Sequence, residues 1–201
     1  MALFIVFEGC DGSGKTTQSR TLLRRLHREG CPALLAREPG GTPLGEAVRR
    51  WLKAPGSIAP LAELLLFTSA RAQLVSQVIR PALGEGVTVI CDRFTPSTVA
   101  YQGYGRGLDL ALVHQLNRLA SDGLIPHLTV LLDLHPEAGL ARKGATRTDP
   151  FDAAPLEFHR RVRQGYLAQA AEQPDRWLVL DATRPRRELA REIWAKIQPL
   201  L

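Results

Sequence analysis

Five short runs of apolar residues divide the chain, and none of them alternates apolar with polar positions. They occupy residues 3–8, 33–37, 87–91, 128–134 and 177–181. Runs without polar alternation are typical of parallel strands that helices cover on both faces. The pattern therefore predicts five buried strands.

Between these runs, apolar residues recur at the three- and four-residue spacing of helices that bury one face. The helical stretches are residues 15–29, 44–53, 61–79, 110–121, 136–142, 156–171 and 186–198. Strands that alternate with helices in this way form a doubly wound parallel sheet with right-handed crossovers. We therefore expect an α/β fold with a five-stranded parallel sheet, helices on both faces, and a ligand site outside the carboxyl ends of the strands.

The turn after the first strand carries the pattern G-x-x-x-x-G-K-T, from Gly9 to Thr16. A phosphate cradle needs a buried strand, a tight glycine turn and a helix whose free N–H groups point at the anion, and all three occur here in order. Gly14 and its neighbours let the backbone approach phosphate oxygens. Lys15 is expected to reach the β- and γ-phosphates, and the Thr16 hydroxyl to ligate Mg²⁺. A glycine turn without a ligand is the alternative, but its place between strand and helix favours a nucleoside triphosphate site of the phosphate-loop NTPase type.

With 201 residues, 45% of them hydrophobic, the chain fits a single domain over residues 1–201 with a small mobile insertion. No apolar run approaches the ~18 residues of a membrane span, and the apolar stretch before Glu8 is too short for a signal peptide. We therefore expect a cytoplasmic protein with no membrane partner. Cys10, Cys31 and Cys91 are too few and too scattered for a disulfide framework, while the place of Cys10 in the phosphate loop leaves a reactive thiol open.

The net charge of +6 and the pI of about 9.7 by themselves suggest a nucleic-acid partner. However, only four of the 26 basic residues are lysines, and no basic stripe is interleaved with aromatic residues. Arginine suits bidentate binding of phosphate groups, so the charge fits anionic small molecules at least as well. We expect no nucleic-acid partner.

Polar residues follow the predicted strands at the edge where the ligand site should lie. Asp92 and Arg93 follow the third strand directly, and Asp133 ends the fourth. A strand-end aspartate can hold Mg²⁺ directly or through water, although it can also cap the next helix. The guanidinium of Arg93 can clamp a phosphate group with two hydrogen bonds.

Residues 95–107 form a polar, aromatic and glycine-rich segment that is poor material for a core. Tyr101 offers a stacking or steric surface, and Thr98 and Gln102 can hydrogen-bond a base edge. The segment is therefore a candidate for recognition of a nucleotide.

Phe67 and Arg71 are four residues apart in the predicted helix 61–79 and share one of its faces. An aromatic ring one turn from a guanidinium suits a nucleobase, because the ring stacks and the arginine donates to a carbonyl. Each residue taken alone has a simpler reading, in which Phe67 belongs to the core and Arg71 is a surface charge.

As a set, these motifs resemble the bacterial thymidylate kinases, in the same order and through essentially the whole chain. The motifs are the phosphate loop, residues 37–42, residues 67–71, Asp92 and Arg93 with residues 97–103, and residues 181–183. Only the phosphate loop is specific alone. The resemblance implies direct in-line transfer of the ATP γ-phosphoryl group to dTMP, with Mg²⁺, giving dTDP and ADP, and usually a homodimer.

The resemblance also implies roles for individual residues. At ATP it places Gly9, Asp11, Gly12, Ser13, Gly14, Lys15, Thr16, Thr17, Ala182 and Thr183. At dTMP it places Glu38, Pro39, Phe67, Arg71, Arg93, Ser97, Thr98, Tyr101 and Gln102. The metal residues are Thr16 and Asp92, and the catalytic residues are Lys15, Arg93, Arg142, Arg147 and Asp11.

Several of these roles are specific. Phe67 would stack on thymine, Arg71 would donate to a thymine carbonyl, and Tyr101 would crowd the 2′ position of the sugar. Ala182 and Thr183 would flank the adenine. Pro39 resembles a position that follows a cis peptide bond.

A lid is expected at about residues 142–155, where Arg142, Lys143 and Arg147 place three cations beside small residues. Phosphoryl transfer needs cations that neutralise charge on the oxygens of the transferred group, and these residues could supply them. The alternative is that the segment is an ordinary charged loop exposed to solvent. Pro150 stands where relatives often carry an arginine. The transition-state cation is therefore expected to be Arg147 or Arg142.

Two other classes of protein remain as alternatives at this point. A kinase for a different nucleoside monophosphate would not need Phe67, Arg71 and Tyr101 together. The second is a nucleotide-dependent switch or a nucleic-acid-binding protein. A switch of the GTPase type should carry an N-K-x-D run, which the sequence lacks, and a nucleic-acid binder should lose affinity steeply with salt.

Overall fold

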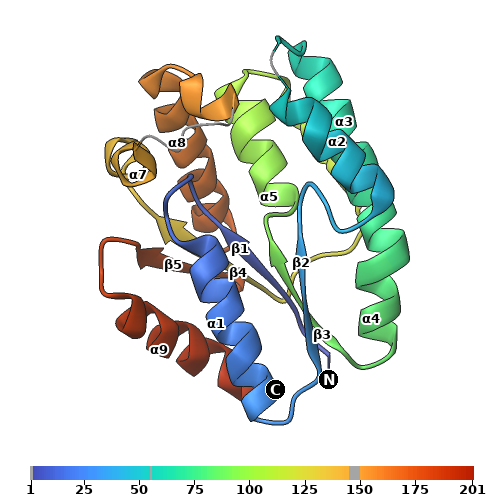
Figure 1. The fold of residues 1–201 in the computed structure, drawn as a ribbon, viewed down its shortest axis with the longest axis vertical. Helices are drawn as coiled ribbons and strands as arrows, with labels where there is room; N and C mark the ends of the chain where they lie inside the picture. The colour runs from blue at the N-terminus through green and yellow to red at the C-terminus, as the bar shows by residue number, and fades with distance from the viewer. Residues whose placement is uncertain (1, 55, 145–149) are drawn as a thin grey trace.

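The computed structural model describes residues 2–54, 56–144 and 150–201. Its sheet has five parallel strands in the order β2-β3-β1-β4-β5 (Figure 1). The strands are β1 (Phe4–Glu8), β2 (Ala33–Arg37), β3 (Thr88–Asp92), β4 (Leu128–Asp133) and β5 (Trp177–Asp181). The predicted doubly wound sheet is confirmed, and every strand begins and ends within one residue of the predicted position.

Helices cover the sheet on both faces (Figure 1). The α-helices are α1 (Lys15–Arg28), α2 (Pro43–Lys53), α3 (Pro60–Leu74), α4 (Arg80–Gly84), α5 (Thr95–Thr98), α6 (Leu110–Ala120), α7 (Pro136–Lys143), α8 (Leu156–Glu172) and α9 (Arg186–Ile197). Two π-helical segments, η1 (Val75–Ile79) and η2 (Val99–Gly105), and three 3₁₀ turns, η4 (Pro150–Ala153), η5 (Pro174–Arg176) and η6 (Gln198–Leu200), complete the described elements. Within the described ranges, no helix is both long enough and apolar enough to cross a membrane.

Strand β1 shows why the sheet needs two helical layers. All five of its side chains are buried, and successive side chains of a strand point to opposite faces. Ile5 and Phe7 pack in the core cluster that contains residues of α1 and α9, whereas Phe4 and Val6 pack in the cluster that contains residues of η1 and α4. A strand without polar alternation therefore lies at the centre of the molecule.

The helix predicted at 61–79 is longer than expected and not uniformly α-helical. It runs without interruption from α3 through η1 into α4, because the residues at both junctions, Val75 and Arg80, keep right-handed helical angles. Pro81 lacks an N–H group and would disturb a regular helix interior. A π-helical turn, whose hydrogen bonds span five residues, is a local adjustment of that kind.

The segment 95–107 differs most from its prediction. It is helical over α5 and η2, and most of η2 is buried instead of lying outside the core. Two glycines make this packing possible: a Cβ atom on Gly105 would lie 2.7 Å from the Phe158 ring, and one on Gly165 would lie 2.8 Å from the Tyr104 ring. Segment η2 therefore packs directly on α8.

The contact between η2 and α8 gives a test of the fold. We expect Gly165→Ala to lower the free energy of unfolding by about 1–3 kcal/mol, because the new methyl group overpacks the contact with Tyr104. A thermal melt followed by circular dichroism measures the change. Gln164→Ala, at the neighbouring exposed position of α8, is the matched control and should melt like the parent. Equal melting of the two variants would contradict this account of the packing.

Candidate functional site

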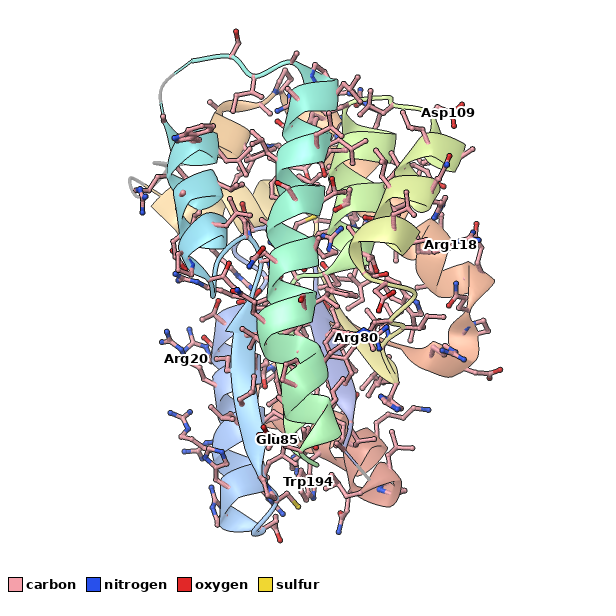
Figure 2. The ribbon with its side chains drawn as sticks, turned by 90° about the vertical axis from the view of Figure 1, so that its right-hand side faces the viewer. Arg20, Arg80, Glu85, Asp109, Arg118 and Trp194 are labelled. Carbon is pink, nitrogen blue, oxygen red and sulfur yellow. The ribbon has the colours of Figure 1, made fainter. Side chains whose placement is uncertain are left out.

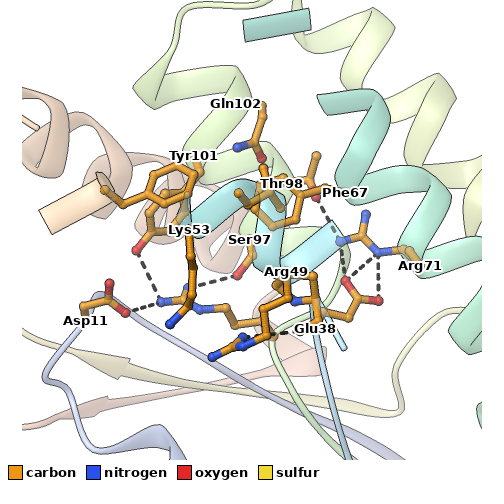
Figure 3. Close-up of a pocket in the computed structure, with 14 residues that line it drawn as sticks. Asp11, Glu38, Arg49, Lys53, Phe67, Arg71, Ser97, Thr98, Tyr101 and Gln102 are labelled. Carbon is orange, nitrogen blue, oxygen red and sulfur yellow. Dashed lines mark hydrogen bonds and ion pairs between the residues drawn. The ribbon is translucent and has the colours of Figure 1, made fainter. Parts of the chain in front are cut away.

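A cavity of about 220 Å³ opens beside the carboxyl ends of β1, β2 and β3, where a parallel sheet places its ligand site (Figure 3). Its lining comprises Asp11, Glu38, Pro39, Arg49, Leu52, Lys53, Phe67, Arg71, Arg93, Ser97, Thr98, Tyr101, Gln102 and Phe151. All nine residues that the sequence analysis places at the acceptor nucleotide are among them.

Arg71 is fully buried, so its reading as a surface charge is wrong. Its Nε lies 3.1 Å and 2.9 Å from the two carboxylate oxygens of Glu38, and its Nη2 donates to Thr98 Oγ1 at 2.9 Å. Nη1 donates to Asn117 Oδ1. Burial raises the pKa of Glu38, and the guanidinium of Arg71 opposes that rise. Nη2 also donates to Glu38 Oε2, so four of the five N–H groups of the arginine are used, and no described residue accepts a hydrogen bond from the fifth, on Nη1.

The peptide bond between Glu38 and Pro39 is cis, as the resemblance implied. Thr42 caps α2 with its side chain, accepting from Gly45 N at 3.0 Å. This cap begins a helix that lines the cavity.

Arg93 stands between the cavity and the phosphate loop. Its backbone has a φ of +73°, an uncommon conformation for a residue with a side chain. Nη2 lies 2.7 Å from Asp11 Oδ1 and 3.3 Å from Tyr101 Oη, and Nη1 donates to Ser97 Oγ (Figure 3). Nη1 also donates to Tyr166 Oη at 3.0 Å. The guanidinium is therefore held in place by four side chains.

Glu8, which the sequence analysis treated only as the end of a strand, organises the turn that holds Arg93. Its buried carboxylate accepts from Phe94 N at 2.8 Å, from Ser97 Oγ at 2.7 Å and from Tyr166 Oη at 2.9 Å. Burial raises the pKa of Glu8, against the opposing charge of Arg93. The one sign of this role in the sequence was the position of Glu8, a carboxylate at the end of an otherwise apolar strand.

The phosphate loop leads into the N-terminus of α1, whose first N–H groups lack helical partners and can bind an anion. Lys15 Nζ donates to the carbonyls of Gly9 at 2.9 Å and Cys10 at 3.0 Å, so the side chain folds over its own loop. Ser13 Oγ is buried without a hydrogen-bond partner in the described part of the chain. Thr17 lies in the first turn of α1, its N–H bonded to the Gly14 carbonyl.

The backbone of the phosphate loop lies directly on α7. A Cβ atom on Gly12, whose φ is +78°, would lie 2.5 Å from the Gly139 carbonyl oxygen. A Cβ atom on Gly139 would lie 2.5 Å from the Asp11 carbonyl oxygen. Each of the two glycines therefore leaves room for the backbone of the other segment.

Thr16 and Asp92 meet at the mouth of the loop, where Thr16 Oγ1 donates to Asp92 Oδ2 at 2.7 Å. A hydroxyl and a carboxylate are oxygen ligands of the kind that Mg²⁺ prefers, and this ion usually takes one or two protein ligands beside phosphate oxygens and water. No group of three or more His, Cys, Asp or Glu residues that could hold a metal occurs within the described ranges. The residues fit Mg²⁺ bound together with a nucleotide.

Arg142 lies on the other side of the loop, outside the cavity lining. Its Nη2 donates to the Ala182 carbonyl at 3.1 Å, and its Nη1 lies 3.4 Å from the Gly12 carbonyl. Thr183 is exposed, with its N–H and hydroxyl bonded to Asp181 Oδ1. Arg147, the alternative candidate for the transition-state cation, lies outside the described residues.

Several residues of the cavity lie outside the motifs predicted from the sequence. Arg49 and Lys53 are four apart on α2, and Arg49 Nη1 lies 3.3 Å from the Pro39 carbonyl. The ring of Phe151, in η4, lies 6.2 Å from that of Phe67 and 5.8 Å from that of Tyr101. The sequence offered a signal for Arg49 and Lys53, since these two cations lie one helical turn apart in the helix that follows residues 37–42.

Similarity to known proteins covers almost the whole chain. The family model described as Thymidylate kinase matches residues 7–193. Thymidylate kinase of Synechococcus sp. (strain JA-2-3B'a(2-13)) is 52% identical over 199 residues, 99% of this chain and 96% of that protein. That of Deinococcus radiodurans is 53% identical over 199 residues, 97% of this chain and 96% of that protein. The crystal structure of thymidylate kinase from Ehrlichia chaffeensis superposes with a TM-score of 0.76 at 40% identity, covering 89% of this chain and 92% of that one.

The environment of Cys10 gives a test of the loop. Burial raises the pKa of its thiol to about 11, so very little reactive thiolate exists near neutral pH. Cys91 is fully buried, whereas Cys31 is partly exposed. We expect one thiol per native chain to react rapidly with an aromatic disulfide reagent near neutral pH, and Cys31→Ser to remove that reaction. Labelling of Cys10 as fast as Cys31, located by mass spectrometry, would contradict the assignment.

Proposed function

Because the chain belongs to the thymidylate kinase family, we propose that its cavity binds dTMP and that its phosphate loop binds ATP. The enzyme is a nucleoside monophosphate kinase, a transferase that phosphorylates dTMP to dTDP with ATP. One observation carries the assignment of the two sites. The ion pair between Arg93 and Asp11, at 2.7 Å, joins the cavity to the phosphate loop, so an acceptor phosphate held by Arg93 lies next to a donor held by the loop.

Arg93 is the clamp for the acceptor phosphate in this proposal. Its planar fork matches two phosphate oxygens, and a phosphate group can replace the Asp11 carboxylate as its anionic partner. Asp11, Ser97 and Tyr166 keep the guanidinium in place before the substrate arrives. Preorganised positive charge of this kind supports in-line transfer through positioning and charge neutralisation.

The thymine base lies against Phe67, whose ring stacks on one face of it. The remaining N–H of Arg71 donates to a base carbonyl, and Thr98 and Gln102 complete the base edge. Tyr101 stands where the sugar enters, held by its hydroxyl at 3.3 Å from Arg93 Nη2, and excludes a 2′-hydroxyl group. Glu38 and Pro39 close the side of the cavity that β2 forms.

The ATP phosphates lie in the loop from Gly9 to Thr17, with Ser13 Oγ as an additional hydrogen-bond donor and Lys15 as the cation. Ala182 and Thr183 flank the adenine. Arg142 or Arg147 supplies the cation for the transferred group, and the position of Arg142 between the loop and Ala182 supports a role beside the ATP phosphates.

Thr16 and Asp92 hold Mg²⁺ in this proposal, because their oxygens already face one another at the mouth of the loop. A bound Mg²⁺ would neutralise charge on the ATP phosphates. The protein needs no general base, since the acceptor is a phosphate group that is already ionised at neutral pH.

We also propose that residues 1–201 act as one domain with a lid at about 142–155, and that the enzyme works in the cytoplasm on free nucleotides. Its three cysteines are free, which suits a reducing compartment. Many of its arginines pair with acidic residues on the surface, as Arg184 does with Glu192. Such pairing leaves less unpaired charge for a nucleic acid.

A homodimer is the expected assembly, and α3 with α6 offers a surface for it (Figure 2). The two helices contact each other and expose large apolar side chains. These are Leu61 and Leu65 on α3 and Leu110, Leu112 and Leu119 on α6. Large exposed apolar side chains on neighbouring helices suit an interaction surface, and two copies can bury the same surface against each other.

Arg93→Ala tests the site. We expect kcat/KM for dTMP to fall by at least about 100-fold, because the acceptor phosphate loses its clamp while the loop still binds ATP. A coupled assay of ADP release measures the loss. Arg80→Ala, which removes an arginine paired with Asp122 far from the cavity, is the control and should retain activity. Near-normal turnover by folded Arg93→Ala protein would refute the clamp.

Leu65→Glu tests the dimer. A charge in the apolar patch should convert a dimer into a monomer, as measured by light scattering after size exclusion. Leu200→Glu, which changes an exposed leucine near the C-terminus, should leave the dimer intact. A parent protein that stays monomeric at high concentration would exclude the assembly.

A further inference from the structure

Glu63 is bonded to Gln102, a residue of the cavity lining, and belongs to none of the motifs identified in the sequence. On α3 it precedes Phe67 by one turn and Arg71 by two, so the three side chains share one face of the helix. Glu63 is 3% exposed, which is unusual for a carboxylate and requires partners.

Two side chains satisfy this carboxylate. Arg106 donates to both oxygens, from Nε at 3.2 Å and from Nη2 at 2.9 Å. Gln102 donates from Nε2 to Oε1 at 2.7 Å. Because an arginine can only donate, both oxygens of Glu63 act as acceptors in this arrangement.

An acceptor at this position fixes which way the Gln102 carboxamide points. With the amide reversed, its oxygen would lie 2.7 Å from a carboxylate oxygen, and two acceptors would face each other without a hydrogen between them. Gln102 is buried, so no bulk water relieves that contact. The NH₂ group therefore faces Glu63, and Oε1 remains available; no described residue donates to it.

Gln102 and Arg71 consequently present an acceptor and a donor to a base. The acceptor is Gln102 Oε1, and the donor is the remaining N–H of Arg71, across from Phe67 (Figure 3). Thymine carries the complementary pair, an N3–H donor and an O4 acceptor. Cytosine carries the reverse, an N3 acceptor and an N4 amino donor, and would leave buried polar groups unpaired.

We propose that Glu63 is a positioning residue for base specificity: it holds the Gln102 carboxamide in the one orientation that accepts thymine and rejects cytosine. The proposal rests on the dTMP site assigned above. Uracil has the same hydrogen-bonding edge as thymine, so Glu63 discriminates dTMP and dUMP together against dCMP and contributes nothing to the choice between the first two.

Glu63→Gln tests this role, because a glutamine can donate as well as accept and so permits either orientation of Gln102. The measurement is kcat/KM for dTMP, dUMP and dCMP in the same preparation, with ATP and Mg²⁺. We expect the dTMP-to-dCMP ratio to fall by about tenfold or more, and the dTMP-to-dUMP ratio to stay unchanged. Since each ratio is taken within one variant, partial loss of folded protein cancels.

Arg106→Lys is the matched control. It disturbs the same ion pair but keeps a cation beside Glu63, which stays an acceptor, so the dTMP-to-dCMP ratio should remain that of the parent. An unchanged ratio in Glu63→Gln, or an equal fall in both variants, would overturn the proposal. If Glu63→Gln does not fold, the parent enzyme still tests the proposal: turnover of dCMP as efficient as that of dTMP would refute it. Absence of dTMP turnover in the parent would instead refute the site assignment itself.

Discussion

The buried ion pair between Arg71 and Glu38 is the interaction on which the acceptor site depends. Glu38 follows β2, Arg71 lies on α3, and the same guanidinium bonds Thr98 of α5 and Asn117 of α6. Four elements far apart in the chain therefore meet at one side chain. A buried charge that loses its partner costs about 3–5 kcal/mol, so the pair tolerates no change on one side alone. Its value is geometric, because it fixes the relative positions of the elements that surround the cavity.

Three cations of the site within the described part of the chain are engaged by the protein itself. Arg93 is bonded to Asp11 and its neighbours, Lys15 to loop carbonyls, and Arg142 to Gly12 and Ala182. When a substrate binds, each of these cations would exchange a carboxylate or carbonyl partner for a phosphate oxygen. The side chains therefore do not have to be ordered from a solvated state. Preorganisation of this kind reduces the free-energy cost of binding and of reaching the transition state.

The sequence was sufficient for the parts of the structure that depend on neighbouring residues. Apolar runs without alternation located all five strands, and strand, glycine turn and helix located the phosphate loop. Four-residue spacing placed Phe67 and Arg71 on one face. The failures involve distant partners: η2 is buried because Glu63 and α8 satisfy and cover its polar residues, which no local pattern shows. Glu8, Tyr166 and Arg49 became site residues for the same reason, since their partners lie on other elements.

The contact between Gly12 and Gly139 has a mechanical consequence. Two backbones that touch without intervening side chains have no soft layer to absorb displacement. We therefore expect a shift of the phosphate loop to displace α7, since the loop contacts Gly139 in the middle of this short helix and Arg142 follows three residues later. The two glycines therefore couple the position of the phosphate loop to that of Arg142.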